Sequence, residues 1–294
     1  LNQIFNPPTL LFMIFFFILG ACIGSFLNVV IFRYNSIIEH TNAKEIFEWF
    51  KEKNIPFPEQ LMGLLKEFNL SFPSSHCPIC NNKLKWYHNV PILGYIILRG
   101  KCAFCKSPIS IQYPIVEIIG GIILLSTYII FIPKGVIVFI IMTILFFVLF
   151  TLLAIDIKSF LLPDGLNYFL IWFGLFLSSI SLSIMNLSLK ESLYGVFAGY
   201  IILYIIVIFG KIVFKKESIG QGDFKLLAGL GSFIGVKGVI FTVFSSPFIG
   251  IFTWIILKTI RKDENMLPYG PSLIICSLIY IFYGEPVLKY LNIM

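Results

Sequence analysis

The chain has 294 residues, of which 58% are hydrophobic and only 13% are charged, and its mean hydropathy is +0.92. A water-soluble core cannot bury this much apolar surface, so the composition excludes an ordinary soluble protein and predicts a polytopic membrane protein. The net charge of +7 is explained by membrane topology and lipid contact, and it does not indicate nucleic-acid binding.

Apolar runs that cross a hydrocarbon layer of about 30 Å need about 20 residues. The first run has no basic residues before it and no small-residue cleavage site after it, so we expect a retained span rather than a removed signal peptide. The predicted span at 224–236 is short, which indicates tilting, kinking or an incomplete crossing. The sequence predicts an all-α fold with about eight membrane spans at residues 10–32, 114–132, 136–155, 166–185, 193–214, 224–236, 238–257 and 272–290.

Lysine and arginine residues are distributed unevenly between the two sides of this eight-span arrangement. Of the 22 basic residues, only Lys134, Lys190, Lys237 and Lys289 fall on one side. The positive-inside rule assigns the other side to the cytoplasm and places both termini outside it.

One polar segment, residues 34–113, interrupts the apolar sequence between the first two spans. Its first part, residues 45–70, mixes charged and apolar residues around Pro56 and Pro58, which predicts two short amphipathic helices. We therefore predict a first span at 1–33, a small cytoplasmic module at 34–113 and a membrane bundle at 114–294.

The module contains two CxxC motifs, separated by 21 residues and formed by Cys77, Cys80, Cys102 and Cys105. This spacing is typical of a tetrahedral four-thiolate zinc site. Disulfide or redox roles stay open as alternatives, although a reducing cytoplasmic location favours metal. Four sulfur ligands leave no open position, so a zinc ion here is expected to be structural.

Two aspartates stand at the ends of apolar spans. Asp156 follows the uncharged run 136–155, and Asp223 closes Gly220-Gln221-Gly222-Asp223, where the glycines permit close approach of the backbone. Ionisable groups at membrane depth are costly and usually functional. Two converging carboxyl groups could divide the acid and base roles of an aspartic protease. The alternatives are independent interfacial caps, a cation or proton transporter, and a zinc-stabilised assembly scaffold without catalysis.

Further charged residues accompany the aspartates. Asp164 follows Leu161-Leu162-Pro163 and is predicted to cap the next helix. For Lys158, two residues beyond Asp156, an ion pair with that aspartate and contact with a lipid phosphate both stay open.

Polar residues also occur in and beside the earlier spans. We expect Asn28 and Glu117 to form hydrogen bonds between helices. Arg33 and Arg99 are interpreted as anchors to lipid headgroups.

Several short motifs follow one another along almost the whole chain. They are Gly24-Ser25-Phe26-Leu27-Asn28-Val29-Val30, the paired CxxC motifs, Ser110-Ile111-Gln112-Tyr113-Pro114-Ile115-Val116-Glu117, Ile155-Asp156 with Leu161-Leu162-Pro163-Asp164, Gly220-Gln221-Gly222-Asp223-Phe224-Lys225-Leu226-Leu227, and Leu267-Pro268-Tyr269-Gly270-Pro271. No single motif is decisive, but the ordered set resembles the type IV prepilin peptidase family of the bacterial inner membrane.

The resemblance implies a bifunctional enzyme with its catalytic face in the cytoplasm. Asp156 and Asp223 match the family's catalytic aspartates, and the four module cysteines match its zinc site. The implied substrates are prepilins or pseudopilins of type II secretion, whose new N-terminus is methylated with S-adenosylmethionine. Tyr269 replaces the family's usual phenylalanine, and Phe32-Arg33-Tyr34 lacks a histidine that is often found there.

Overall fold

The structure is a computed structural model that describes residues 9–65, 68–214, 220–260 and 268–290. Within these ranges the fold is helical, and two isolated β-bridges, His76 with Lys83 and Lys101 with Pro108, are its only extended pairings. The α-helices are α1 (Leu10–Glu52), α2 (Leu93–Ile97), α3 (Gln112–Phe131), α4 (Val136–Ser159), α5 (Asp164–Ser179), α6 (Leu189–Phe214), α7 (Gln221–Ile260) and α8 (Gly270–Tyr290), and the 3-10 helices are η1 (Glu59–Leu65), η2 (Trp86–Asn89) and η3 (Ile132–Lys134).

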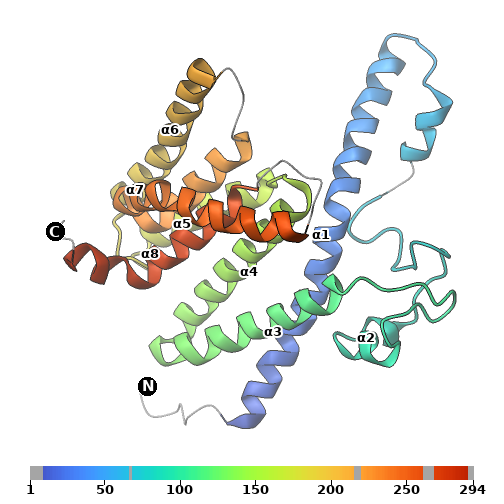
Figure 1. Cartoon of the computed structure of the whole chain (residues 1–294), viewed down its shortest axis with the longest axis horizontal. Coiled ribbons are helices and arrows are strands. Elements are labelled where there is room, and N and C mark those ends of the chain that lie inside the picture. The colour runs from blue at the N-terminus through green and yellow to red at the C-terminus, as the bar shows by residue number, and fades with distance from the viewer. Residues whose placement is uncertain (1–8, 66–67, 215–219, 261–267, 291–294) are drawn as a thin grey trace. The chain divides into compact units, whose positions relative to one another are not determined.

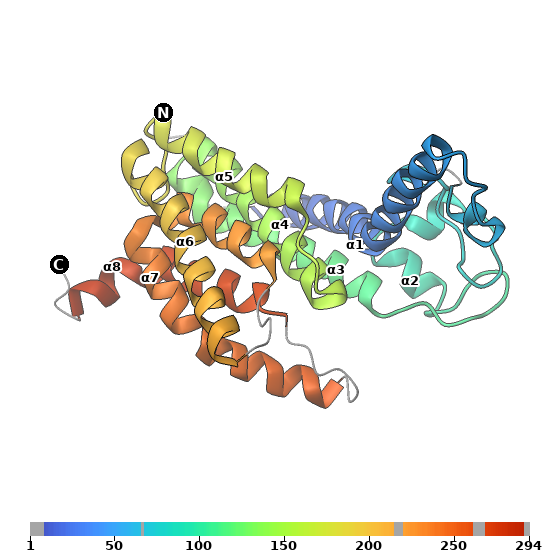
Figure 2. The same ribbon diagram turned by 90° about the horizontal axis from the view of Figure 1, so that it is seen from above.

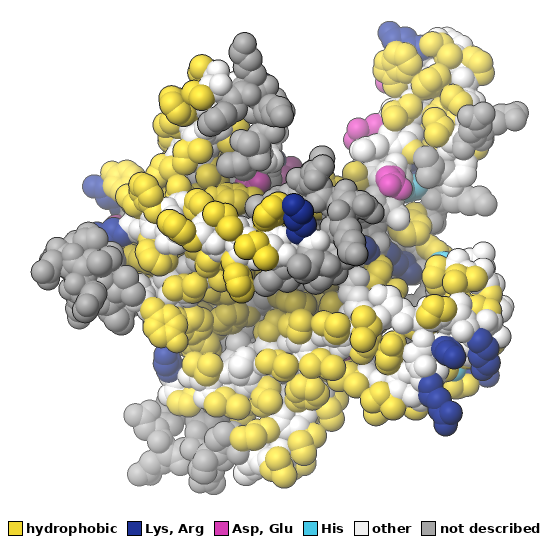
Figure 3. Space-filling view, viewed as in Figure 1, with side chains coloured by type: hydrophobic (Ala, Val, Ile, Leu, Met, Phe, Trp, Pro, Cys, Tyr) yellow, Lys and Arg dark blue, Asp and Glu magenta, His cyan; other side chains and the backbone are white. Residues whose placement is uncertain are grey.

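In the described part of the chain, five helices, α1, α3, α4, α6 and α7, are long and apolar enough to cross a membrane. Hydrophobic side chains cover much of the visible helix surface (Figure 3), as contact with lipid requires. Each of the eight predicted spans has a helical counterpart, but α5 has only 16 residues, about 24 Å, and two predicted spans fall within α7. The all-α prediction is confirmed, whereas the count of eight spans stays a prediction.

The short predicted span at 224–236 corresponds to the first part of α7. At Gly235 the backbone leaves the helical conformation, with φ 63° and ψ −175°, and this break separates the two predicted spans. Before the break, Leu226, Leu227 and Leu230 are almost completely buried. This segment is surrounded by protein, so it does not need the length of a lipid-exposed span.

The first helix continues well beyond the membrane span that was predicted for it. Residues 25–55 contain neither glycine nor proline, and α1 ends only near Asn54, which has φ 53° and precedes Pro56 by two residues. The prediction of two short amphipathic helices at 45–70 was therefore wrong: the first is part of α1, and the second is the 3-10 helix η1.

The chain divides into two compact units, residues 1–147 and 148–294. In the first unit, α3 lies against the N-terminal half of α1 (Figures 1 and 2). Glycines permit this close packing, since a Cβ atom on Gly24 would stand 2.7 Å from the carbonyl oxygen of Val116. In the second unit, α7 packs against α5, α6 and α8. The predicted three-part division of the chain stays a prediction.

Candidate functional site

Asp156 lies in the last turn of α4, and its side chain is only 4% exposed. The helix ends just after it, because Phe160 takes a left-handed conformation with φ 55° and donates its N–H to the Asp156 carbonyl at 2.9 Å. The Asp156 carboxyl group accepts a hydrogen bond from the backbone, since Gly270 N lies 3.0 Å from Oδ2. The first residue of α8 therefore positions this acid.

Asp223 lies in the first turn of α7 and is 7% exposed. Its backbone N–H donates to the Gly220 carbonyl at 3.2 Å, and its carboxyl group interacts with the backbone of Gly220. Gly222 also has a spatial requirement, because a Cβ atom there would stand 2.9 Å from Cβ of Leu162. Of the two predicted supporting glycines, Gly220 directly precedes α7 and Gly222 lies in its first turn.

The two acids, 67 positions apart in the sequence, come together in the second unit. Leu162 connects their surroundings, since its side chain lies beside Gly222 and also about 3.5 Å from a Cβ atom placed on Gly270. The carboxyl groups are close enough for the charge of Asp156 to act on Asp223. The structure therefore brings two buried carboxyl groups from different helices close enough to interact electrostatically.

Asp164 is the first residue of α5, but it does not cap that helix as predicted. The N-cap position is occupied by Pro163, and no side chain makes a capping hydrogen bond. Instead, both carboxylate oxygens of Asp164 lie 2.8 Å from Nζ of Lys225. The Lys225 ammonium group gives this carboxylate charge-assisted hydrogen bonds, which take the place of the predicted cap.

A second residue of α5 supports the same turn of α7. Asn167, one helical turn after Asp164, is completely buried, and its Nδ2 atom lies 3.5 Å from the Gly222 carbonyl oxygen. Two side chains on one face of α5 therefore reach the segment that carries Asp223. Lys158 lies in the last turn of α4, and both interpretations of it stay predictions.

Tyr269, Lys225 and Asn167 were not identified as site residues from the sequence. Tyr269 is largely buried, its hydroxyl group forms a hydrogen bond with Oγ of Ser246, and burial raises its pKa. The charge of Asp223 acts on this phenol, which places Tyr269 near the acids. Its presence in a quoted motif was the only sequence signal for it.

The four module cysteines form one cluster, and their sulfur atoms all lie within 4.8 Å of one another. The Sγ atoms of Cys77 and Cys105 are 3.8 Å apart, and those of Cys80 and Cys102 are 4.0 Å apart. Tetrahedral zinc with bonds of about 2.3 Å requires sulfur atoms about 3.8 Å apart, whereas a disulfide bond is about 2.05 Å long. The geometry thus fits a bound metal ion and contains free thiols.

Hydrogen bonds also prepare this cluster for metal binding. Backbone N–H groups of Cys80 and Ile79 donate to the Cys77 sulfur and lower the pKa of this thiol to about 6. The Ser107 hydroxyl group, 3.0 Å from Sγ of Cys105, and the Ser107 backbone lower the pKa of the Cys105 thiol. Since the thiolate is the form that binds metal, these contacts favour the metal-binding form of Cys77 and Cys105.

Polar residues in the first unit connect its helices to the module. Nδ2 of Asn28 on α1 donates to the Tyr113 carbonyl on α3 at 2.9 Å, so the predicted bond between helices is confirmed for Asn28. The carboxylate of Glu117 accepts from the Ile92 backbone at 2.7 Å and also forms a hydrogen bond with the Ser25 side chain on α1, so the prediction is confirmed for Glu117 as well. Arg33 donates to the carbonyl groups of Asn69, Leu70 and Pro73, so its interpretation as a headgroup anchor was wrong.

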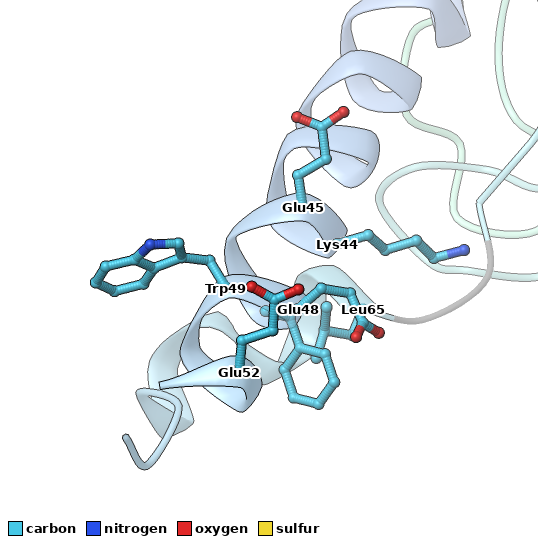
Figure 4. A pocket seen from close by; sticks show the side chains of 7 residues that line it. Lys44, Glu45, Glu48, Trp49, Glu52 and Leu65 are labelled. Atoms are coloured by element: carbon cyan, nitrogen blue, oxygen red, sulfur yellow. The ribbon is translucent and has the colours of Figure 1, made fainter. Parts of the chain in front are cut away.

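A pocket of about 720 Å³ lies on the projecting end of α1 beside η1 (Figure 4). Its lining includes the exposed acidic side chains of Glu45, Glu48 and Glu52 together with Trp49. It contains neither the aspartates nor the cysteines of the predicted sites. We therefore do not identify it with the catalytic site.

Comparisons with known proteins agree with this arrangement. The model of the bacterial peptidase A24 N-terminal domain matches residues 18–131, and the model of the type IV leader peptidase family matches residues 143–255. No solved structure matches the chain. A prepilin leader peptidase/N-methyltransferase of Stutzerimonas stutzeri is 34% identical and covers 96% of this chain and 93% of its own length.

Two further proteins with that name show similar agreement. The relative from Pseudomonas aeruginosa is 33% identical over 95% of this chain and 93% of its own length, and the one from Aeromonas hydrophila is 32% identical over 93% and 91%. These matches extend over both units and confirm the resemblance seen in the ordered motifs. The chain belongs to the type IV leader peptidase family.

Proposed function

We propose that this chain is a membrane aspartic endopeptidase that removes the leader peptides of type IV prepilins or type II secretion pseudopilins and then N-methylates the new N-terminus. The observation that carries the proposal is the convergence of Asp156 and Asp223, two buried acids from different helices. The family relatives, whose names combine leader peptidase and N-methyltransferase, support both activities.

In the proposed reaction, the two carboxyl groups share one proton, because two adjacent buried charges of the same sign repel each other. The ionised carboxylate takes a proton from a water molecule while the oxygen of that water attacks the scissile carbonyl carbon. The protonated carboxyl group donates its proton to the carbonyl oxygen. As the C–N bond of the tetrahedral intermediate breaks, the carboxyl group that took the proton from water donates it to the leaving amine nitrogen. The other carboxylate takes back a proton from a hydroxyl group of the intermediate, which leaves as a carboxylic acid.

The Gly270 N–H group contributes by orientation. It donates a hydrogen bond to Oδ2 of Asp156 and so fixes the orientation of the carboxyl group. Because the donor belongs to the backbone, this orientation does not depend on a flexible side chain. The face of Asp164 and Asn167 on α5 supports the backbone around Asp223 from the other side. In this proposal the two aspartates carry out the reaction, and the neighbouring residues hold them in position.

We place the acids at the cytoplasmic face of the bacterial inner membrane, as the distribution of basic residues predicts. Asp156 lies in the final turn of its helix, and Asp223 lies in the first turn of its own. Transporter sites usually lie near the membrane midplane at interrupted helices. The terminal positions of these acids therefore favour the peptidase over the transporter alternative.

We further propose that Cys77, Cys80, Cys102 and Cys105 hold a structural zinc ion. The support is the sulfur spacing, which fits four-thiolate coordination. Bound zinc would stabilise the folded module and would have no open position for substrate. Methylation would use S-adenosylmethionine as methyl donor, and we assign no residues to that site.

The function is tested by incubating membranes that contain this protein with a candidate prepilin and determining the mass of the pilin N-terminus. The proposal expects loss of the leader, followed by an increase of one methyl group when S-adenosylmethionine is present. Matched membranes without the protein are the control. An intact leader after incubation with several prepilins and pseudopilins would contradict the proposal.

A further inference from the structure

The short helix α2 exposes an apolar face in the middle of the cysteine module. Leu93, Ile96 and Ile97 are 55%, 60% and 67% exposed, and their i, i+3, i+4 spacing places them on one side of the helix. Beside this face, α2 packs inward at the buried Gly94, where a Cβ atom would collide with the His88 carbonyl. A small module in water would not be expected to expose three large aliphatic side chains together.

The start of α2 is fixed to a membrane-spanning helix. The Ile92 N–H group donates to Oε2 of Glu117 at 2.7 Å, and Ile92 has the unusual φ of 62°. A β-branched residue in this conformation is strained and needs surrounding contacts to hold it. The Glu117 carboxylate, which also interacts with Ser25 on α1, supplies such a contact.

The position of Glu117 sets the depth of α2. Helix α3 has 20 residues and so is about 30 Å long, the thickness of the hydrocarbon layer. Glu117 lies five residues after Gln112, or about 7–8 Å along the helix axis. Interfacial helices bury their apolar faces to about 5–10 Å, at the boundary of headgroups and acyl chains. The bond from Glu117 to Ile92 thus brings α2 to the level of the lipid interface.

Residues around α2 have the composition of a membrane interface. Trp86 is 80% exposed, and tryptophan prefers the headgroup level. Basic residues flank the segment on both sides and would contact anionic headgroups. Figure 3 shows basic and hydrophobic side chains mixed on the visible face of this module. The flanking basic residues are Lys83, Lys85, Arg99 and Lys101.

We propose that residues 83–101, with α2 at their centre, dock onto the anionic phospholipid surface beside α3. These residues form the loop between the two CxxC motifs, so the metal site closes the base of the lipid-binding loop. This arrangement holds the cysteine module at a fixed height beside the first unit's helices. The proposal is independent of peptide cleavage.

The test compares two isoleucines by tryptophan quenching in lipid nanodiscs. The full-length protein with its four native tryptophans changed to phenylalanine receives either Ile96→Trp or, as a matched control, Ile46→Trp. Ile46 is also exposed, at 46%, but it lies on the part of α1 that projects beyond the predicted span. Brominated phospholipids in the nanodiscs quench tryptophan that contacts the acyl chains.

We expect quenching at least about twofold stronger for Ile96→Trp than for Ile46→Trp, and stronger in nanodiscs with brominated phosphatidylglycerol than with brominated phosphatidylcholine. Equal quenching at the two positions would overturn the proposal.

A second pair of variants uses native tryptophans as probes, so that no tryptophan is introduced. One variant retains only the native Trp86 and the other only Trp49, and the same twofold difference is expected. Peptide cleavage by each variant verifies that the bundle is folded. Weaker quenching of Trp86 than of Trp49 in active protein would contradict lipid docking.

Discussion

Gly270→Ala should impair catalysis without unfolding the protein. The added Cβ atom would stand 2.6 Å from Oδ2 of Asp156, whereas an ordinary contact begins at 3.4 Å, so the oxygen must retreat by about 0.8 Å. The atom that must move is at the end of a flexible side chain, and Leu162 lies at an ordinary 3.5 Å. The fold can therefore accommodate the methyl group, but the acid loses its position.

The expected loss follows from this displacement. A misplacement of about 1 Å at a reacting group can reduce the rate about 100-fold. Weakening a hydrogen bond to a charged group costs about 1.5–3 kcal/mol, which corresponds to a factor of about 10 to 150. Both routes give a decrease in kcat of about 10- to 100-fold, with KM nearly unchanged because substrate contacts stay in place.

The assay measures initial rates of prepilin cleavage by purified protein, together with its thermal unfolding. Gly165→Ala is the matched control, because a Cβ atom at this exposed position in the first turn of α5 meets no atom within 4 Å. It should retain full activity. Normal kcat in Gly270→Ala would refute the view that Gly270 positions Asp156, and a large loss of stability would show that the clash falls on the fold instead.

Three further predictions concern the ion pair beside the site, the cysteine cluster and the membrane topology. Asp164→Asn and Lys225→Met should each destabilise the protein by less than about 1 kcal/mol, since their ion pair is partly exposed, and the double variant should show less than the sum of the two effects in unfolding measurements. Cys77→Ser should lower the metal content, from about one zinc per chain by elemental analysis, while peptide cleavage persists at least in part; wild-type protein with free thiols and no zinc would contradict the metal assignment. Tags in the loop near Lys262, which lies outside the described residues, should report the cytoplasm and tags near Lys190 the opposite side, and the reverse result would overturn the predicted topology.

The parts of the protein that could be predicted from sequence are those with local signals. Apolar runs located the helices, the two CxxC motifs located the sulfur cluster, and buried acids at span ends indicated Asp156 and Asp223. The continuation of α1 also had a local signal in the absence of glycine and proline from residues 25–55, but the prolines that follow drew the prediction toward shorter helices.

Contacts between distant segments could not be predicted in this way. Gly270 is 114 residues from the acid that it positions, and no local pattern connects a backbone N–H group to a distant carboxylate. The cap prediction for Asp164 relied on adjacent residues, the proline before it and the apolar run after it. Its partner Lys225 is 61 residues away and gives no local signal. Tertiary packing decides such pairings, and it overrode the local preference of aspartate for an N-cap.

The central claim is that Asp156 and Asp223 together cleave the leader peptide. The most direct measurement is the rate of prepilin cleavage by Asp156→Asn and Asp223→Asn, each purified with normal yield and compared with wild type. Since asparagine has similar shape but cannot exchange the proton, each rate should fall by about 100-fold or more. Cleavage at the wild-type rate by either variant would contradict the two-aspartate mechanism.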